Sequence, residues 1–371
     1  MRVLHSGTLD TNAGGPAMST YFTLLGLRQL GVEAEIIMFP LSKGGRLRGE
    51  EVPVHFTAAP VIPKILYSPV LRRDIRALGP FDIYHAQGIW QYNTYALVDE
   101  ARRAGKPYVI TPRGMLYPQD IAKSNASLKR LSLRWRLLRD LNGAACVHVT
   151  CEDERDHCRR LGITAPIAII PNPVDIHDYP PPADDGTFRF GYLGRVSRRK
   201  NIHGLIEAYR QLGPDAAGTE LLIIGDGDAD YREELRRQAA QVEHGQVRFT
   251  GFLNGEDKDQ AIASLSVLVM PSEFENFGMV VTEALARRIP CIATTGAPWR
   301  ELQTHHCGWW IPYEQEALNA TLRQALATDR PTRRSMGEHG RQLVEQRYSV
   351  ESVAEQMART YASLMNGNRP V

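Results

Sequence analysis

The stretch "FRFGYLGRVSRRKNIHGLIEAYRQL", from Phe188 to Leu212, decides the fold class. It opens with the short apolar run "FRFGYLG", which is typical of a buried β-strand. It closes with "NIHGLIEAYRQL", in which apolar residues recur at helical spacing. A strand, a glycine turn and a helix in this order predict one unit of a parallel sheet with crossover helices.

The same alternation extends in both directions along the chain. Towards the N-terminus, further strands are predicted in "RVLHSG", "EAEIIMF", "FDIYHA", "KPYVIT", "ACVHVT" and "IAII". Towards the C-terminus, strands are predicted in "ELLIIGDG", "QVRFTG", "SVLVMPS" and "PCIATT". The sequence therefore predicts an α/β protein with two Rossmann-like, doubly wound domains.

The domain boundary is expected in a proline-rich segment between Ala165 and Phe188, because dense proline can continue neither a helix nor a central strand. We predict an N-terminal domain over 1–170, a C-terminal domain over 171–349, and a final helix over 350–371 that packs back on the first domain. The carboxyl ends of the two sheets are expected to face a shared cleft that binds ligands. The tail from Ala317 to Met365 is predicted to be helical, with breaks near Gly337 to Gly340 and near Tyr348.

Composition narrows the class of protein. Of the 371 residues, 43% are hydrophobic and 23% are charged, which is typical of a soluble globular protein. A net charge of +2 gives no argument for nucleic acid. The N-terminus "MRVLHSGTLD" lacks the apolar core of a secretory signal. No run reaches the length of about 20 apolar residues that spans a bilayer. The five cysteines are irregularly spaced, which fits a reducing compartment better than a set of disulfides. These features predict a cytoplasmic protein.

Three glycine turns follow predicted strands and could approach a phosphate. The first, "GRVSRRKN", places Gly194, Arg195 and Lys200 just before a helix, which suits a diphosphate. A solvated basic surface turn is the alternative. The other two turns hold Gly225 in "GDGD" and Gly15 in "GGP"; each is equally explained as a tight turn, and "GDGDAD" lacks the third glycine of a dinucleotide fingerprint.

The segment "PSEFENFGMVVTEALARRIP", from Pro271 to Pro290, carries Glu275 and Glu283 with seven residues between them. A helix is predicted to begin near Gly278, so Glu275 precedes it and Glu283 lies about one turn inside. Amides at the helix start could bind a phosphate, and a carboxylate beside them could bind a vicinal diol. Considered singly, Glu275 could merely favour the helix N-terminus and Glu283 could be an ordinary surface residue.

Together these segments resemble the retaining glycosyltransferases of family 4, which have the GT-B architecture. The resemblance rests on "GRVSRRKN", "GDGD", "VRFTGFLN" and the E-x7-E pattern of "ENFGMVVTE", in the family's order over roughly 100 residues. The N-terminal half matches more loosely, through "GGP", "YHAQGIW" and "IPNPVD".

The resemblance implies a role for each matching position. Arg195 and Lys200 would bind the nucleotide diphosphate, Glu275 would contact hydroxyls of the donor sugar, and Glu283 would bind the ribose. The remaining expected donor contacts are backbone groups or loop residues: Gly15, Gly225, Leu253, Phe277, Gly278, Met279 and Val280. The implied reaction is sugar transfer from a nucleotide sugar to an acceptor hydroxyl with retention of configuration, in bacterial surface polysaccharide or glycolipid biosynthesis. With both glutamates holding the donor, we expect front-face departure of the diphosphate, without a metal ion.

One position departs from the family's pattern. Many members have a histidine after the strand that matches "PYVIT", where this chain has Arg113. Arginine could hold a phosphate or a sugar hydroxyl but could not act as a base. His85, at another strand end, is the alternative catalytic group, although a structural histidine explains it equally well.

A basic amphipathic segment lies at 121–140. Lys123, Lys129, Arg130, Arg134, Arg136 and Arg139 accompany an apolar stripe of Leu128, Leu131, Trp135 and Leu138. Two interpretations stay open: peripheral contact with an anionic membrane that carries a lipid-linked acceptor, or a helix docked on its own sheet. For the whole chain, the alternatives to a transferase are a nucleotide-sugar epimerase, a phosphorylase, or a non-catalytic scaffold that binds sugar nucleotides.

Overall fold

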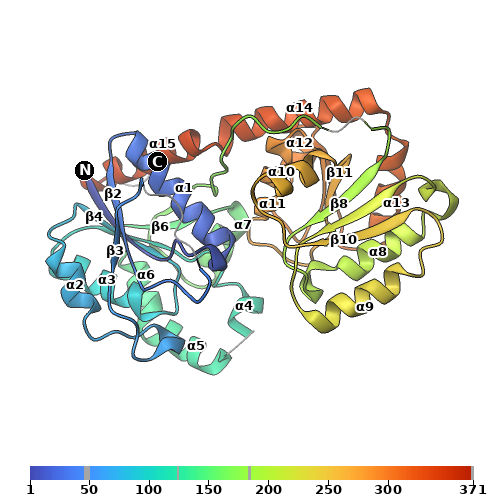
Figure 1. Cartoon of the computed structure of the whole chain (residues 1–371). Coiled ribbons are helices and arrows are strands. Elements are labelled where there is room, and N and C mark those ends of the chain that lie inside the picture. The colour runs from blue at the N-terminus through green and yellow to red at the C-terminus, as the bar shows by residue number, and fades with distance from the viewer. Residues whose placement is uncertain (46–50, 123–124, 183–184, 369–371) are drawn as a thin grey trace. The chain divides into compact units, whose positions relative to one another are not determined.

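The computed structural model describes residues 1–45, 51–122, 125–182 and 185–368. The chain forms two compact units (Figure 1). Unit 1 comprises Met1–Asp175 together with Ser349–Val371, and unit 2 comprises Ile176–Tyr348. In each unit a parallel sheet has helices packed against it, which confirms the predicted α/β class.

Unit 1 contains a seven-stranded sheet in the order β3-β2-β1-β4-β5-β6-β7, with every neighbouring pair parallel. The central strands β4, β5 and β6 are buried along their whole length, because apolar clusters cover both faces of the sheet. The strands are β1 (Arg2–Ser6), β2 (Glu33–Met38), β3 (Val54–Phe56), β4 (Ile83–Gln87), β5 (Tyr108–Thr111), β6 (Cys146–Val149) and β7 (Ile167–Ile169). The helices are α1 (Gly15–Gln29), α2 (Leu71–Ala77), α3 (Tyr92–Arg103), α4 (Pro118–Ala122), α5 (Ala126–Ser132), α6 (Leu138–Asn142), α7 (Glu152–Arg160) and α15 (Val350–Met365). Two short 3-10 turns are η1 (Thr11–Ala13) and η2 (Pro63–Ile65), and the π-helical segment η3 (Leu133–Leu137) joins α5 to α6.

Unit 2 contains a six-stranded parallel sheet in the order β10-β9-β8-β11-β12-β13. Its strands are β8 (Arg189–Leu193), β9 (Glu220–Ile224), β10 (Gln246–Gly251), β11 (Val267–Met270), β12 (Cys291–Thr294) and β13 (Gly308–Ile311). Its helices are α8 (Ile202–Arg210), α9 (Ala229–Ala239), α10 (Gly255–Ala263), α11 (Met279–Ala286), α12 (Glu301–Thr304), α13 (Gln315–Ala327) and α14 (Arg330–Arg347), with short turns η4 (Arg198–Lys200) and η5 (Gly213–Ala216).

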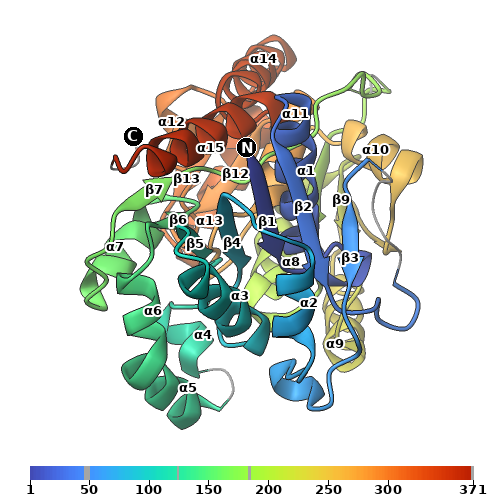
Figure 2. The same cartoon turned by 90° about the vertical axis from the view of Figure 1, so that its left-hand side faces the viewer.

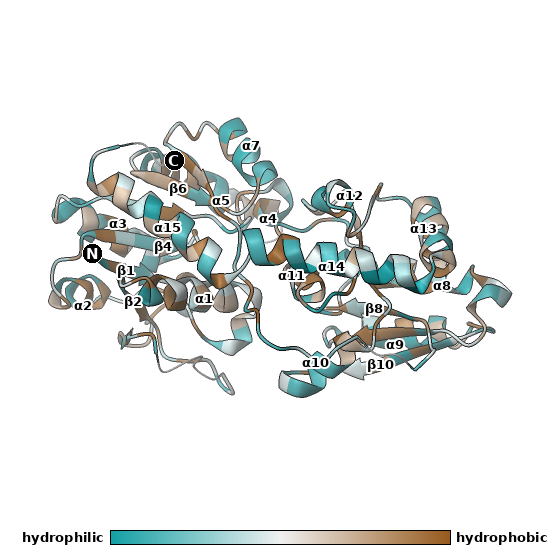
Figure 3. Cartoon of the chain, turned by 90° about the horizontal axis from the view of Figure 1, so that it is seen from above, coloured by the Kyte–Doolittle hydropathy of each residue, from teal (hydrophilic) through white to brown (hydrophobic). Residues whose placement is uncertain are grey.

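The last helix, α15, lies along α1 in unit 1 (Figure 3). The two backbones approach closely at Gly26, where an added Cβ would lie 2.7 Å from the Cβ of Ala354. Val353, Met357 and Tyr361 complete the apolar cluster on this face of the sheet. Unit 1 is therefore built from both ends of the chain.

The predicted break near Gly337 to Gly340 is wrong, because α14 runs through both glycines. An added Cβ at Gly337 would lie 2.1 Å from the carbonyl oxygen of Arg288, and one at Gly340 would lie 2.6 Å from Leu285 Cδ2. These glycines allow α14 to pack tightly against the end of α11. The helical tail is instead interrupted before α14, where the Asp329 side chain accepts a hydrogen bond from the amide of Thr332, and the predicted break near Tyr348 is confirmed between α14 and α15.

Candidate donor-binding site and its surroundings

The strand order of the sheet in unit 2 reverses between the neighbouring strands β8 and β11. The loops that follow these two strands both carry predicted site residues. From β8, one branch of the sheet continues to β9 and β10 and the other to β11, β12 and β13. The loop after β8 carries Arg195 and Lys200, and the loop after β11 carries Glu275. Ligands of doubly wound sheets bind at the carboxyl ends of the strands at this switch point.

Lys200 and Glu275 meet across the switch point. The ammonium of Lys200 donates to Glu275 Oε1, and the hydroxyl of Ser272 donates to the same oxygen over 2.8 Å. The Lys200 and Glu275 side chains are 20% and 11% exposed. Water is largely excluded from this pair, so its charges interact more strongly than surface charges do. The sequence did not indicate that Lys200 and Glu275 contact each other, and it did not indicate a role for Ser272.

Arg195 and the start of α11 lie at the same switch point, one on each loop. The Arg195 side chain is exposed, and its guanidinium has no hydrogen-bond or carboxylate partner among the residues that the structure describes. Gly278 precedes α11 with φ of 81°, and among the described residues no side chain caps the helix. The first amides of α11, from Met279 and Val280, are therefore available to an anion.

An aromatic cluster supports the loop before α11. The indole of Trp299 donates a 2.5 Å hydrogen bond to the carbonyl of Phe277, and the rings of Trp299 and Phe277 pack 5.5 Å apart. Tyr348 packs against both rings. Because the Phe277 side chain is buried, only its backbone is placed to contact a ligand. Trp299, which sequence reasoning missed, fixes the direction in which α11 begins.

Glu283 lies one turn inside α11 and forms an ion pair with Lys258 of α10, with Nζ and Oε2 2.8 Å apart. Sequence reasoning did not anticipate Lys258. Leu253, the predicted base contact, is half-buried in the loop between β10 and α10. The loop after β10 and the first turns of α11 thus carry the residues predicted to contact base and ribose.

Gly225 has a structural reason to be glycine. It directly follows β9 and has φ of 143°, and an added Cβ would lie 1.9 Å from the carbonyl oxygen of Gly194, which directly follows β8. Its amide donates over 2.9 Å to the carbonyl of Gly251 at the end of β10. Gly225 lets three adjacent strand ends approach one another, and this accounts for it without a ligand.

We expect Gly225→Ala to lower the free energy of unfolding of unit 2 by more than about 2 kcal/mol, because both backbone strain and the clash with Gly194 oppose the side chain. Gly218→Ala is the matched control: its φ of 76° is also positive, but nothing lies within 4 Å of an added Cβ. Calorimetry of both variants separates the clash from the strain. Equal losses in the two variants would contradict the clash.

Gly15 lies at the switch point of unit 1, between β1 and β4. It is the first residue of α1, it is exposed, and Gly14 before it has φ of 65°. No side chain among the described residues caps α1. The free backbone amides at the start of α1 are therefore available to an anion, as the sequence suggested.

Arg113 is engaged by protein groups of unit 1. Its guanidinium donates to Gln87 Oε1 over 2.6 Å and 3.1 Å, to Ser19 Oγ over 2.6 Å and to Thr20 Oγ1 over 2.8 Å. Burial lowers the pKa of Arg113 to about 10, so the group stays cationic at neutral pH. These bonds tie β4 to the first turns of α1. The structure thus places Arg113 as a support for the helix that begins at Gly15.

His85 is completely buried, which favours the structural interpretation over the catalytic one. Its Nδ1 is hydrogen bonded with the hydroxyl of Tyr361 at 2.5 Å, and its Nε2 with Thr111 Oγ1 at 2.6 Å. With both ring nitrogens occupied and no exposed surface, His85 has no free group for a substrate.

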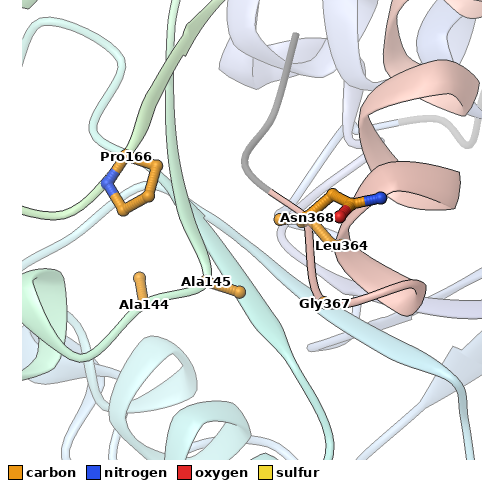
Figure 4. A pocket seen from close by; sticks show the side chains of 6 residues that line it. All are labelled: Ala144, Ala145, Pro166, Leu364, Gly367 and Asn368. Atoms are coloured by element: carbon orange, nitrogen blue, oxygen red, sulfur yellow. The ribbon is translucent and has the colours of Figure 1, made fainter.

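A pocket of about 310 Å³ lies elsewhere in unit 1 (Figure 4). It is lined by Ala144, Ala145, Pro166, Leu364, Gly367 and Asn368. This lining contains no charged group, so the pocket offers nothing that would hold a phosphate or activate a hydroxyl.

Comparisons with known proteins identify the family of the chain. Residues 176–343 match the family model described as "Glycosyl transferases group 1", and residues 14–173 match "Glycosyl transferase 4-like domain". Together the two matches cover most of the chain.

Among curated proteins, the chain is 29% identical over 177 residues to an uncharacterized glycosyltransferase of Methanocaldococcus jannaschii, a match that covers 47% of this chain and 44% of that protein. It is 26% identical over 328 residues to phosphatidyl-myo-inositol mannosyltransferase of Mycolicibacterium smegmatis, covering 85% of this chain and 80% of that protein. The first match thus spans less than half the length of the relative.

Among solved structures, Anabaena HepE in complex with UDP and glucose superposes with a TM-score of 0.76 at 20% identity, covering 98% of this chain and 100% of that one. At this identity the likeness concerns the fold alone. The family models, the two doubly wound sheets and the fold of these relatives agree, and the chain therefore belongs to the group 1 glycosyltransferases of the family 4 type, with the GT-B architecture.

Proposed function

We propose that the chain is a retaining glycosyltransferase that moves a sugar from a nucleoside-diphosphate sugar to an acceptor hydroxyl. The observation that carries the proposal is the Lys200–Glu275 pair at the switch point, beside the uncapped start of α11. It offers a carboxylate for sugar hydroxyls and a cation and amides for a diphosphate. The ligands named for HepE, UDP and glucose, support a donor of this class.

In the proposed reaction, the bond between the anomeric carbon and the diphosphate oxygen breaks, and the acceptor oxygen bonds to the same carbon from the same face. The acceptor proton passes to the departing diphosphate, so atoms and charge balance. Lys200, Arg195 and the amides of Met279 and Val280 stabilise the negative charge that develops on the diphosphate, without a metal ion. Glu275 holds the sugar and Glu283 the ribose.

Replacing each glutamate by glutamine tests this division of roles. Glu275→Gln is expected to lower kcat by tenfold or more, because its hydroxyl contacts matter most in the transition state, whereas Glu283→Gln is expected mainly to raise the KM for the donor. Slow hydrolysis of the donor without acceptor supplies the rate, and thermal shift against a panel of nucleotide sugars identifies the donor. Equal effects of both substitutions on kcat and KM would contradict the division.

The same assay addresses the alternatives. A non-catalytic scaffold would bind the donor tightly and show no turnover with any acceptor. A GT-B epimerase would convert the donor into a stereoisomer without releasing nucleoside diphosphate. The transferase is supported if the chain releases nucleoside diphosphate and the folded Glu275→Gln variant does not.

We further propose that the enzyme works in the cytoplasm at the inner face of the membrane, in the synthesis of a bacterial surface polysaccharide or glycolipid. The name of the mycobacterial relative includes a phosphatidyl-inositol acceptor, which supports a lipid-linked acceptor here. Within the described residues, no helix has the length and apolar content to cross a bilayer. Any association with a membrane through these residues would be peripheral.

The basic segment 121–140 supports this location, although Lys123 lies outside the described residues. Its helices dock on unit 1 through Leu133, Leu137 and Leu141, which belong to or pack on the apolar core. Of the predicted apolar stripe, Leu128, Leu131 and Trp135 are exposed, whereas Leu138 packs on the apolar core. One apolar face of the segment therefore packs inward, as the docked-helix interpretation predicts, and an outward apolar face is left that supports the proposed membrane contact.

A further inference from the structure

A second exposed apolar segment lies in unit 1, in the loop that contains η2. Val61, Ile62 and Ile65 expose 64%, 48% and 46% of their surface, although each is aliphatic. The loop is held in shape by a backbone bridge between Ile62 and Tyr67. On the basic segment, Leu128, Leu131 and Trp135 expose 65%, 53% and 79%. Large exposed aliphatic and aromatic groups in two separate segments indicate a contact surface.

Both segments pack against the first turns of α3. The rings of Tyr67, at the end of the η2 loop, and Tyr92 of α3 lie 4.7 Å apart. On the other side, the hydroxyl of Tyr95 in α3 is hydrogen bonded with the hydroxyl of Ser132 in α5 over 2.9 Å. Figures 1 and 2 both show the η2 turn and α5 at the lower end of unit 1. The two segments therefore flank one helix and face the same side.

The charge around both segments is positive. The sequence has no Asp or Glu between Ile121 and Arg139, and none between Thr57 and Arg73. Lys64, Arg130 and Arg134 are exposed, and no carboxylate among the described residues pairs with them. Arg136, in contrast, is bound to Asp99 and Asp140, which hold it in the fold.

Building on the proposed function, we propose that these two segments form one membrane-binding surface and that the acceptor is carried by a lipid in an anionic bilayer. Aliphatic tips and a tryptophan would enter the headgroup region, and Lys64, Arg130 and Arg134 would contact anionic headgroups. The segments follow the carboxyl ends of β3 and β5, and α3 between them follows β4. A lipid-borne acceptor would thus be delivered to the edge of the sheet where ligands bind in this fold class.

Vesicle flotation of the full chain tests the surface. The vesicles contain phosphatidylcholine with or without about one third phosphatidylglycerol. We expect binding to the anionic vesicles only, and about a tenfold loss of partitioning for each of Val61→Ser/Ile65→Ser, Leu131→Ser/Trp135→Ser and Arg130→Ala/Arg134→Ala. Leu30→Ser is the matched control, because Leu30 is 47% exposed in the same unit but lies at the far end of α1.

Brominated phosphatidylglycerol gives a second measurement. It should quench the fluorescence of Trp135, and Trp135→Phe should lose most of this quenching while it keeps most of the binding. An unchanged partition of the η2-loop variant, or equal binding to neutral vesicles, would overturn the proposal. If the protein forms a dimer in solution and the Leu131→Ser/Trp135→Ser variant is monomeric, the surface binds a second copy of the chain instead of a membrane. Donor hydrolysis without vesicles reports the proposed function separately, and these variants should leave it unchanged.

Discussion

Replacing Lys200 by alanine is expected to lower kcat for sugar transfer by about 10² to 10³, the range seen when one preorganised donor to a developing negative charge is removed. Lys200 has three N–H donors, and Glu275 accepts one of them, which leaves two for phosphate or sugar oxygens. The substitution also leaves the Glu275 carboxylate with Ser272 as its remaining side-chain partner among the described residues. The variant therefore loses the cation and the group that orients the carboxylate.

Arg198→Ala is the control for this prediction. Arg198 lies two residues earlier in the same basic turn, but it is 67% exposed and pairs with Glu234. Its loss should change kcat less than twofold, because exposed ion pairs contribute little. Single-turnover kinetics of both variants, with thermal unfolding to verify folding, provide the comparison. Similar losses from both substitutions would mean that the turn contributes only general positive charge.

The fold class followed from the sequence because strand and helix periodicity are local properties. Eleven strands were predicted, and β3 and β13 were not proposed. β3 has three residues at the edge of its sheet, and such a short strand leaves little periodicity to detect. The helical tail was predicted, but its glycines were interpreted as a break. Whether a glycine ends a helix or admits a neighbour depends on packing, and only the structure contains that information.

The candidate site could be predicted only in part for the same reason. Residues on the strand-end loops, such as Lys200 and Glu275, were identified because their position in the fold follows from local patterns. Their partners, Ser272 and Lys258, and the supporting Trp299 have no distinctive pattern, and their roles arise from tertiary contacts. Likewise, nothing in "TPRGML" indicated that the guanidinium of Arg113 would be hydrogen bonded to Gln87.

Acidification is expected to destabilise unit 1 strongly, because three histidines are buried in its core. His5, His85 and His148 are all inaccessible or nearly so. Burial lowers the pKa of His5 to about 3 and that of His148 to about 4, and it lowers the pKa of His85 well below the ordinary value. They belong to one hydrogen-bonded network in which Tyr361 of α15 contacts His5 and His85, and Thr111 contacts His85 and His148.

The direction of the effect follows from proton uptake. In the unfolded chain these histidines bind protons below a pKa of 6.5, whereas burial keeps His5 and His148 neutral in the folded unit down to about pH 4 and also opposes protonation of His85. Their contribution is therefore fully present above pH 6.5 and is lost as the pH falls towards 4. At about pH 5 the loss is about 2 kcal/mol for each of His5 and His148, a large share of the stability of an ordinary domain. Glu154 acts in the opposite direction, because burial raises its pKa, but it is one group against three.

Calorimetry between about pH 7 and pH 5 measures this effect, since few carboxylates titrate there and the two units can unfold in separate transitions. The transition of unit 1 should move to lower temperature, and near pH 5 unfolding should take up about one proton for each histidine that the folded unit keeps neutral. Folded His148→Gln should remove about one of these protons. His305→Gln, at an exposed position of unit 2, should leave the transition of unit 1 unchanged. A transition of unit 1 that does not move over this range would mean that the buried histidines are already charged in the folded protein or are hydrated within it.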